Sequence, residues 1–107
     1  MRDGMTDAAT ALLKAIRGLL GGAGRFVLEE VHSRAWASVT FSGARHELAF
    51  RLEGAGASEA AGRFLSGLGA AELPLAGHIV ADIALLSEER RPDRTTIRLE
   101  ALTVEDC

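Results

Sequence analysis

The sequence predicts an α+β domain with the element order α-β-β-β-α-β-β, in which two helices pack on one face of a five-stranded antiparallel sheet. Apolar residues recur at helical spacing over 6–20, which indicates an amphipathic helix. Apolar and polar residues alternate through much of 25–53, as they do in strands with one buried face. An apolar run at 78–86 precedes another segment rich in branched residues. The 107 residues fit one domain.

Charge and composition exclude several classes of protein. The formal net charge is −3 and the pI about 5.6, whereas a protein that binds nucleic acid or an anionic membrane normally carries a basic surplus. The apolar segment 8–20 contains Lys14 and Arg17 and is too short to span a bilayer. Cys107 is the only cysteine, so no intramolecular disulfide can form. We therefore expect a cytoplasmic protein with neither a nucleic-acid nor a membrane partner. Lys14 is the sole lysine, a bias typical of GC-rich bacterial genomes.

Two segments carry the signals of helix starts. Thr6 is a suitable N-cap for the first helix, because its hydroxyl can accept a hydrogen bond from a free N–H of the first turn. The second helix is expected over 58–68, with Ser58 as its N-cap. The ends of the chain, residues 1–5 and 105–107, are expected to fray.

The segment 25–53 is predicted to form a three-stranded antiparallel meander. Turns at Ser33-Arg34 and at 42–45 keep one face of the meander almost wholly apolar, whereas a shift of one residue would mix the two faces. In this register, the core face of the first strand carries Phe26, Leu28, Glu30 and His32. The opposite face sets Trp36 directly across from Arg51.

Residues 78–87 and 94–104 are predicted to pair as a hairpin around a charged loop, 88–93. A helix over 78–88 is the alternative, and it would set His78 and Asp82 one turn apart, where they could share a metal ion. A strand would separate the same two residues by ~13 Å, at ~3.3 Å per residue. The β-branched residues of both segments favour the strand.

Two glycine clusters resemble phosphate-binding loops only superficially. Gly21-Gly22-Ala23-Gly24 follows a helix, whereas phosphate loops lead into the N-terminus of one. Gly54-Ala55-Gly56 does precede a helix, but Glu59 stands where a dinucleotide fingerprint has its third glycine and would repel a pyrophosphate. The three histidines lie on separate predicted strands and define no metal site. We expect neither a cofactor nor a metal.

The first five expected elements follow the order found in double-stranded RNA-binding domains. Those domains meet the phosphates with a basic cluster at the start of the second helix. Residues 57–60 read Ala-Ser-Glu-Ala here, so the sequence is not assigned to that family.

Three residues are candidates for catalysis, Glu30, His32 and Asp82. Glu30 and His32 lie two apart on one strand face, where a carboxylate and an imidazole can carry out acid–base chemistry or simply reach solvent at the end of the sheet. Asp82 lies in the apolar run, where an unpaired carboxylate would be costly. One register sets Asp82 opposite Glu100, and the favoured register sets it opposite Arg98, which predicts a structural ion pair.

A second apolar sheet face predicts self-association. Two short helices cannot cover both sides of five strands, so the face that carries Trp36 and Arg51 needs another cover. The residues expected at this interface are Trp36, Arg51, Val31, Val80, Leu86 and Leu102. The leading hypothesis is therefore a homodimeric binding module that assembles through its sheet and can take a protein or small-molecule partner. The alternative is a small enzyme or ligand-binding protein with a pocket between sheet and helices that uses Glu30, His32 or Asp82.

Overall fold

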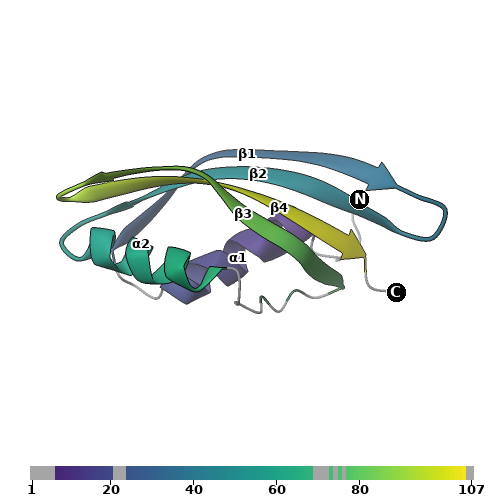
Figure 1. Ribbon diagram of the computed structural model, residues 1–107, viewed down its shortest axis with the longest axis horizontal. Helices are drawn as coiled ribbons and strands as arrows, with labels where there is room; N and C mark the ends of the chain where they lie inside the picture. Colours follow the sequence, from purple (N-terminus) through teal and green to yellow (C-terminus); the bar gives the residue numbers. More distant parts are fainter. Residues whose placement is uncertain (1–6, 21–23, 69–72, 74, 76, 106–107) are drawn as a thin grey trace.

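The computed structural model describes residues 7–20, 24–68, 73, 75 and 77–105. The helices and strands follow one another as α1 (Ala8–Leu20), β1 (Arg25–Ala37), β2 (Ser42–Glu53), α2 (Ala57–Ser66), β3 (His78–Arg91) and β4 (Arg94–Glu105) (Figure 1). The strands form one antiparallel sheet of four strands in the order β1-β2-β4-β3. Each half of the chain thus contributes a helix and a hairpin, and the two hairpins meet where β2 pairs with β4.

The predicted five-stranded sheet is wrong, because residues 25–53 form a hairpin and not a meander. The chain does not turn at Ser33-Arg34, and β1 continues to Ala37. It reverses over the next four residues, where the Phe41 N–H donates to Ser38 Oγ at 3.1 Å. The Ser38 N–H donates in turn to the Phe41 carbonyl oxygen at 2.7 Å.

Gly43 lies within β2, although residues 42–45 were predicted to form a turn. A Cβ atom built there would lie 2.0 Å from the Thr103 carbonyl oxygen, so β2 and β4 approach each other too closely for any larger residue. This glycine is required by strand packing. Trp36 lies opposite it, and Arg51 lies farther along β2, opposite Val27; the predicted Trp36–Arg51 pair does not form.

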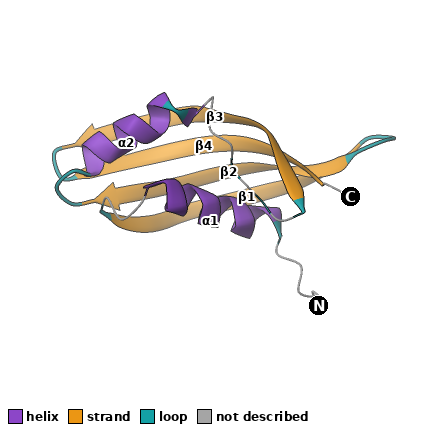
Figure 2. Ribbon diagram, turned by 90° about the horizontal axis from the view of Figure 1, so that it is seen from below, coloured by secondary structure: helices purple, strands orange, loops and turns teal. Residues whose placement is uncertain are grey.

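The molecule has two layers, with both helices on one face of the sheet. Figure 1 shows the sheet edge-on with the helices beneath it, and Figure 2 shows α1 lying along the β1–β2 side and α2 along the β3–β4 side. The turns of the two hairpins lie at opposite ends of the long axis (Figure 1). The molecule measures 47 × 26 × 21 Å. Since a 13-residue strand spans ~43 Å, the strands run almost its whole length.

The hydrophobic core fills the space between the sheet and the helices. The central strands supply its buried side chains, Leu48, Phe50, Leu52, Ile97, Leu99 and Ala101. The helices supply Leu12, Ile16, Leu20, Ala57, Ala61 and Phe64. The Phe50 ring stacks on Phe26 with centroids 4.9 Å apart, and it lies edge-on to the Phe64 ring with centroids 6.3 Å apart. The three rings therefore connect β1 and β2 to α2.

A β-bulge between Leu28 and Glu30 reverses the faces of the second half of β1. Beyond the bulge, Val31 lies opposite Leu48 and packs against the core. Glu30 and His32 consequently point away from the helices, and their predicted place on the core face is wrong. The alternation that predicted it assumes an unbroken period of two, which one extra residue interrupts.

The last two strands form a hairpin, and the stretch 78–91 is a strand, not a helix. The turn is tighter and later than predicted, because only Pro92 and Asp93 connect the strands and the charged residues 88–91 belong to β3. Two further bulges, between Val80 and Asp82 and between Leu85 and Ser87, change the register along β3.

This register removes the predicted ion pair between Asp82 and Arg98. Asp82 lies opposite Leu102, whereas Arg98 lies opposite Ser87 and makes its hydrogen bonds to residues of β1 and β2. Asp82 is also exposed, since β3 is an edge strand, so it does not carry the cost of burial that the apolar run had suggested. His78 lies opposite Glu105, on the helix side of the sheet.

The start of α2 differs from its predicted cap. The predicted N-cap Thr6 lies outside the described residues, and the Asp7 carboxylate accepts a hydrogen bond from the Thr10 N–H at 2.8 Å. α2 follows Gly56, whose φ of 89° suits glycine, so Ser58 is already inside the helix. Glu105 is the last residue of β4. The other terminal residues that were expected to fray lie outside the described part of the chain.

Candidate functional site

The sheet face opposite the helices, called the open face here, carries its side chains in rows set by the strand register. The row nearest the β1–β2 turn contains Trp36, Gly43, Val104 and Ile79. The next row contains Arg34, Arg45, Leu102 and Asp82. Rows farther from the turn are dominated by glutamate and arginine.

A chain of charge-assisted hydrogen bonds crosses the middle of the open face. Arg98 donates to Glu30 Oε1 at 2.7 Å and to Glu47 Oε1 at 3.2 Å, above the buried Ala49. His32 Nε2 lies 2.7 Å from the other Glu30 oxygen. The Arg98 guanidinium, with a smaller contribution from His32, lowers the pKa of Glu30. Glu30 is therefore held as a carboxylate, which favours a structural role over proton donation; a catalytic role for Glu30 and His32 stays a prediction.

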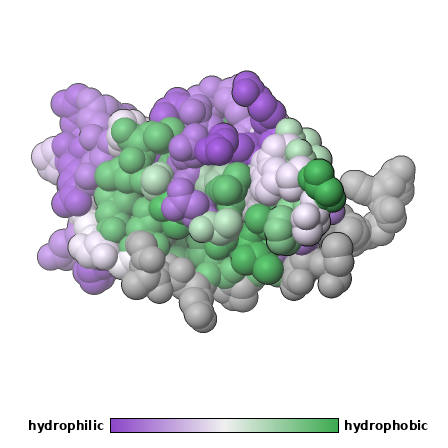
Figure 3. All heavy atoms as spheres, turned by 45° about the vertical axis from the view of Figure 1, so that its right-hand side comes forward, coloured by the Kyte–Doolittle hydropathy of each residue, from purple (hydrophilic) through white to green (hydrophobic). Residues whose placement is uncertain are grey.

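Further ion pairs make the rest of this face hydrophilic. Arg51 donates to Glu53 and to Glu29, both at 2.6 Å, and hydrogen bonding to Arg51 lowers the pKa of Glu53. Arg45 lies 3.6 Å from Glu100. Figure 3 shows hydrophilic atoms along the top, where the open face lies, and hydrophobic atoms gathered below on the helix side. The prediction of an apolar second face is wrong for most of the sheet.

One end of the open face does remain apolar. We call the cluster of Trp36, Ile79, Leu102 and Val104 the apolar corner; Ile79 is 52% exposed and the other three are half-buried. A depression of about 300 Å³ lies beside the Trp36 indole. The indole N–H is buried and has no hydrogen-bond acceptor among the described residues. A buried donor without an acceptor costs about 1–3 kcal/mol.

Of the other residues predicted at an interface, Val31 and Val80 lie on the helix side and pack against the core, so they cannot belong to the open face. Leu86 lies at the second bulge of β3 and is 44% exposed.

Two opposite charges flank the apolar corner on the two edge strands. Arg34 on β1 and Asp82 on β3 share a row, and both are exposed. The ion pairs found within the described residues include neither of them. Three strand spacings separate them, about 14 Å, so they cannot pair within one chain.

A second site lies on the helix side, at the same end of the sheet. A cavity of about 480 Å³ opens between the start of α1 and the ends of all four described strands. The cavity is open because many of its lining residues are small, namely Ala8, Ala9, Ala35, Gly43 and Ala44. Polar side chains in the lining are Asp7, Ser33, His46, His78, Thr103 and Glu105. Cavities that combine an apolar wall with a few convergent polar groups are typical of small-molecule sites.

His46 forms the centre of this second site. Only 1% of it is exposed, and burial lowers its pKa below the ordinary value of 6.5. Its Nδ1 atom lies 2.8 Å from Ser33 Oγ, and its Nε2 atom lies 2.9 Å from Thr103 Oγ1. His78 Nδ1 is buried at the same cavity without a hydrogen-bond partner among the described residues. A pocket between sheet and helices therefore exists, but Glu30, His32 and Asp82 do not line it.

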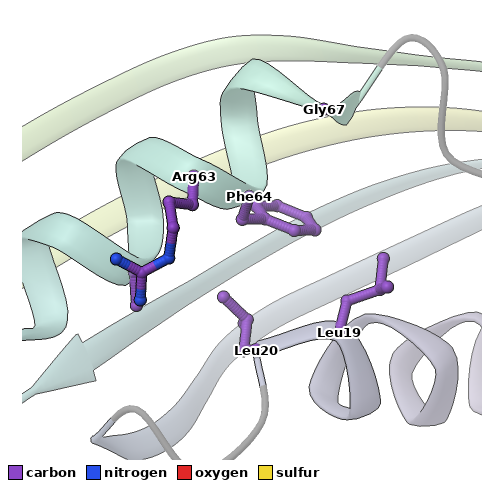
Figure 4. Close-up of a pocket in the computed structure, with 6 residues that line it drawn as sticks. Leu19, Leu20, Arg63, Phe64 and Gly67 are labelled. Atoms are coloured by element: carbon purple, nitrogen blue, oxygen red, sulfur yellow. The ribbon is translucent and has the colours of Figure 1, made fainter.

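A third hollow, of about 240 Å³, lies between the end of α1 and α2 (Figure 4). Leu19 and Leu20 reach it from α1, and Phe64 and Arg63 from α2. Arg63 is its only charged lining residue among those described, so it offers no set of groups for chemistry.

Comparison of the chain with protein-family models, with curated proteins and with solved structures finds no match. Among the described residues, no helix is long and apolar enough to cross a membrane. In the same part of the chain, no group of three or more histidine, cysteine, aspartate and glutamate side chains could hold a metal ion. A proposal about function therefore depends on the geometry of the two sites.

Sequence reasoning missed Arg34, Ser33, His46 and Thr103 as site residues. Ser33 and His46 lie opposite each other in the β1–β2 register, and His46 and Thr103 come from neighbouring central strands. The alternation of β2 already placed His46 on its buried face, which was the available signal. The misplaced turn hid its partner Ser33.

Proposed function

We propose that this protein is a cytoplasmic binding module that forms a weak homodimer through the apolar corner of its open face. The observation that supports this proposal is the row of Arg34 and Asp82, two exposed and oppositely charged residues that flank apolar side chains. Arg34 and Asp82 are too far apart to form an ion pair within one chain, but they can form one between two copies. Such an ion pair would set the orientation of one copy relative to the other.

The proposed dimer has a twofold axis parallel to the strands, so that the two open faces meet and β1 of one copy lies over β3 of the other. Rows then face equivalent rows. Arg34 meets Asp82 of the second copy twice by symmetry, and Trp36 meets Ile79. A second copy is favoured over an unrelated partner, because each copy supplies both the positive charge and the negative charge that the two symmetric ion pairs need.

The area of the corner predicts a weak dimer. Two rows ~6.8 Å apart across four strands ~4.8 Å apart cover roughly 250 Å² per copy. The total of roughly 500 Å² is well below the ~1,200 Å² of stable protein–protein interfaces. The glutamate and arginine side chains beyond the apolar corner already form ion pairs within the chain. Their burial against a second copy, with loss of water, would therefore bring little stabilisation.

Charge exchange tests the proposal. Arg34→Asp and Asp82→Arg should each weaken dimerisation roughly tenfold, because each places like charges together twice, and the double variant should restore it. Sedimentation equilibrium up to millimolar protein measures the dissociation constant. Arg25→Asp is the matched control, since it makes the same charge change on the same strand at the far end of the open face. A monomer at every concentration, or a double variant no tighter than either single variant, would exclude this interface.

A further inference from the structure

The hydrogen bonds around His46 determine which of its nitrogen atoms carries the proton. Thr103 Oγ1 donates its single hydrogen to the Ala44 carbonyl oxygen at 3.3 Å. It must therefore accept the hydrogen bond from His46, so the proton of the neutral ring is on Nε2. His46 Nδ1 is then the atom with the lone pair, and Ser33 donates its hydroxyl hydrogen to it at 2.8 Å.

This arrangement has the three parts of an activated nucleophile. Ser33 is a hydroxyl on an exposed edge strand, His46 is a base within hydrogen-bond distance, and Thr103 orients the base from its other side. The partners sit on three adjacent strands of a rigid sheet, which fixes their geometry without the help of a loop. Neutral imidazole is the state needed to accept a proton, and burial, the largest influence on the pKa of His46, favours that state.

The adjoining cavity indicates the class of substrate. It has room for a small molecule, and two carboxylates, Asp7 and Glu105, are its charged lining groups, with no lysine or arginine among the described ones. These carboxylates disfavour anionic ligands. His78, at the start of β3, also lines this cavity.

We propose that Ser33 is a nucleophile that accepts short acyl groups from small uncharged esters, with His46 as its general base and Thr103 as a positioning residue. Ser33 Oγ forms a bond to the ester carbonyl carbon while its proton passes to His46 Nδ1. The ester C–O bond then breaks, and the proton passes from His46 to the departing alkoxide. Water can afterwards hydrolyse the acyl-serine with the same proton transfers in reverse.

The reaction should be slow. In serine hydrolases, loss of the carboxylate that orients the histidine costs about 10⁴-fold in kcat, and a threonine hydroxyl cannot stabilise the imidazolium as that carboxylate does. The expected product is therefore a single, slowly formed acyl-Ser33, detected more readily as a covalent adduct than as turnover.

Incubation of the whole protein with p-nitrophenyl acetate, followed by peptide mass mapping, tests this proposal. Ser33 should be acetylated, while Ser42, an exposed serine on the same hairpin, is the internal control and should remain free. His46→Gln should slow labelling by at least about 100-fold, the usual contribution of a general base. Thr103→Val should slow labelling about tenfold, and Thr103→Ser, which keeps the hydroxyl, should restore the rate.

The pH profile of the unaltered protein provides a second test if the His46 variant does not fold. Labelling should reach a plateau at neutral pH and fall below 6.5 as His46 becomes protonated. Asp7 beside α1 favours the protonated ring and His78 on β3 opposes it; Glu105 on β4 lines the same cavity. Equal labelling of Ser33 and Ser42, or a Ser33 rate that rises with hydroxide without a plateau, would overturn the proposal.

Discussion

Replacement of Phe50 by alanine should destabilise the protein more than any other single aromatic truncation that the fold suggests. Phe50 is fully buried, and its ring contacts Phe26 of β1 and Phe64 of α2. Phe→Ala in a core costs about 3–5 kcal/mol, and each aromatic contact is worth about 0.5–1.5 kcal/mol of it. We therefore expect a loss of about 4 kcal/mol, against a total stability of about 5–15 kcal/mol for a domain of this size.

Urea denaturation followed by circular dichroism measures this loss in the free energy of unfolding. Phe41→Ala is the matched control, because Phe41 lies in the β1–β2 turn and is 58% exposed; its truncation should cost less than about 0.5 kcal/mol. A loss below about 1.5 kcal/mol for Phe50→Ala, or equal losses for the two variants, would refute the packing of β1 and α2 around this ring.

Three further predictions follow from individual contacts. Gly43→Ala should destabilise by more than about 1 kcal/mol because its Cβ would strike β4, whereas Gly18→Ala, in an open position of α1, should stabilise slightly; denaturation of both variants checks this. Because burial lowers the pKa of folded His46, the unfolded chain binds its proton more tightly, so the free energy of unfolding should fall as pH drops below 6.5 towards the folded pKa; His46→Gln should lack this slope. Arg98→Met should raise the pKa of Glu30 towards 4.5, measured by NMR titration, and an unchanged pKa would contradict the pairing.

The parts of the fold that the sequence predicted correctly are those set by side-chain periodicity. Helical spacing located α1 and α2 within a few residues, and alternation along β2 correctly assigned Leu48, Phe50 and Leu52 to the core and Arg51 to the other face. These patterns are strong because burial of one face is the main source of stability in each element.

The failures come from backbone features that leave almost no trace in composition. Gly43 suggested a turn, but it is there because two strands approach closely. The true turn at 38–41 contains neither glycine nor proline. The bulge after Leu28 moves Glu30 and His32 to the open face, and alternation alone cannot reveal an inserted residue.

The candidate sites were hidden for the same reason. The Ser33–His46 contact joins residues 13 apart in sequence, and only the correct β1–β2 register places them opposite each other. Likewise, the Arg34–Asp82 row requires the register of all four strands. The expectation of self-association remains a proposal, but its basis has moved from a wholly apolar face to one corner.

The most direct test of the proposed function is sedimentation equilibrium on Arg34→Asp, Asp82→Arg and the double variant, beside the unaltered protein. A dimer between open faces predicts that each single variant dissociates more readily and that the double variant recovers the original dissociation constant. If the double variant stays as weak as the single variants, or if all four proteins are monomeric at millimolar concentration, the apolar corner does not bind a second copy.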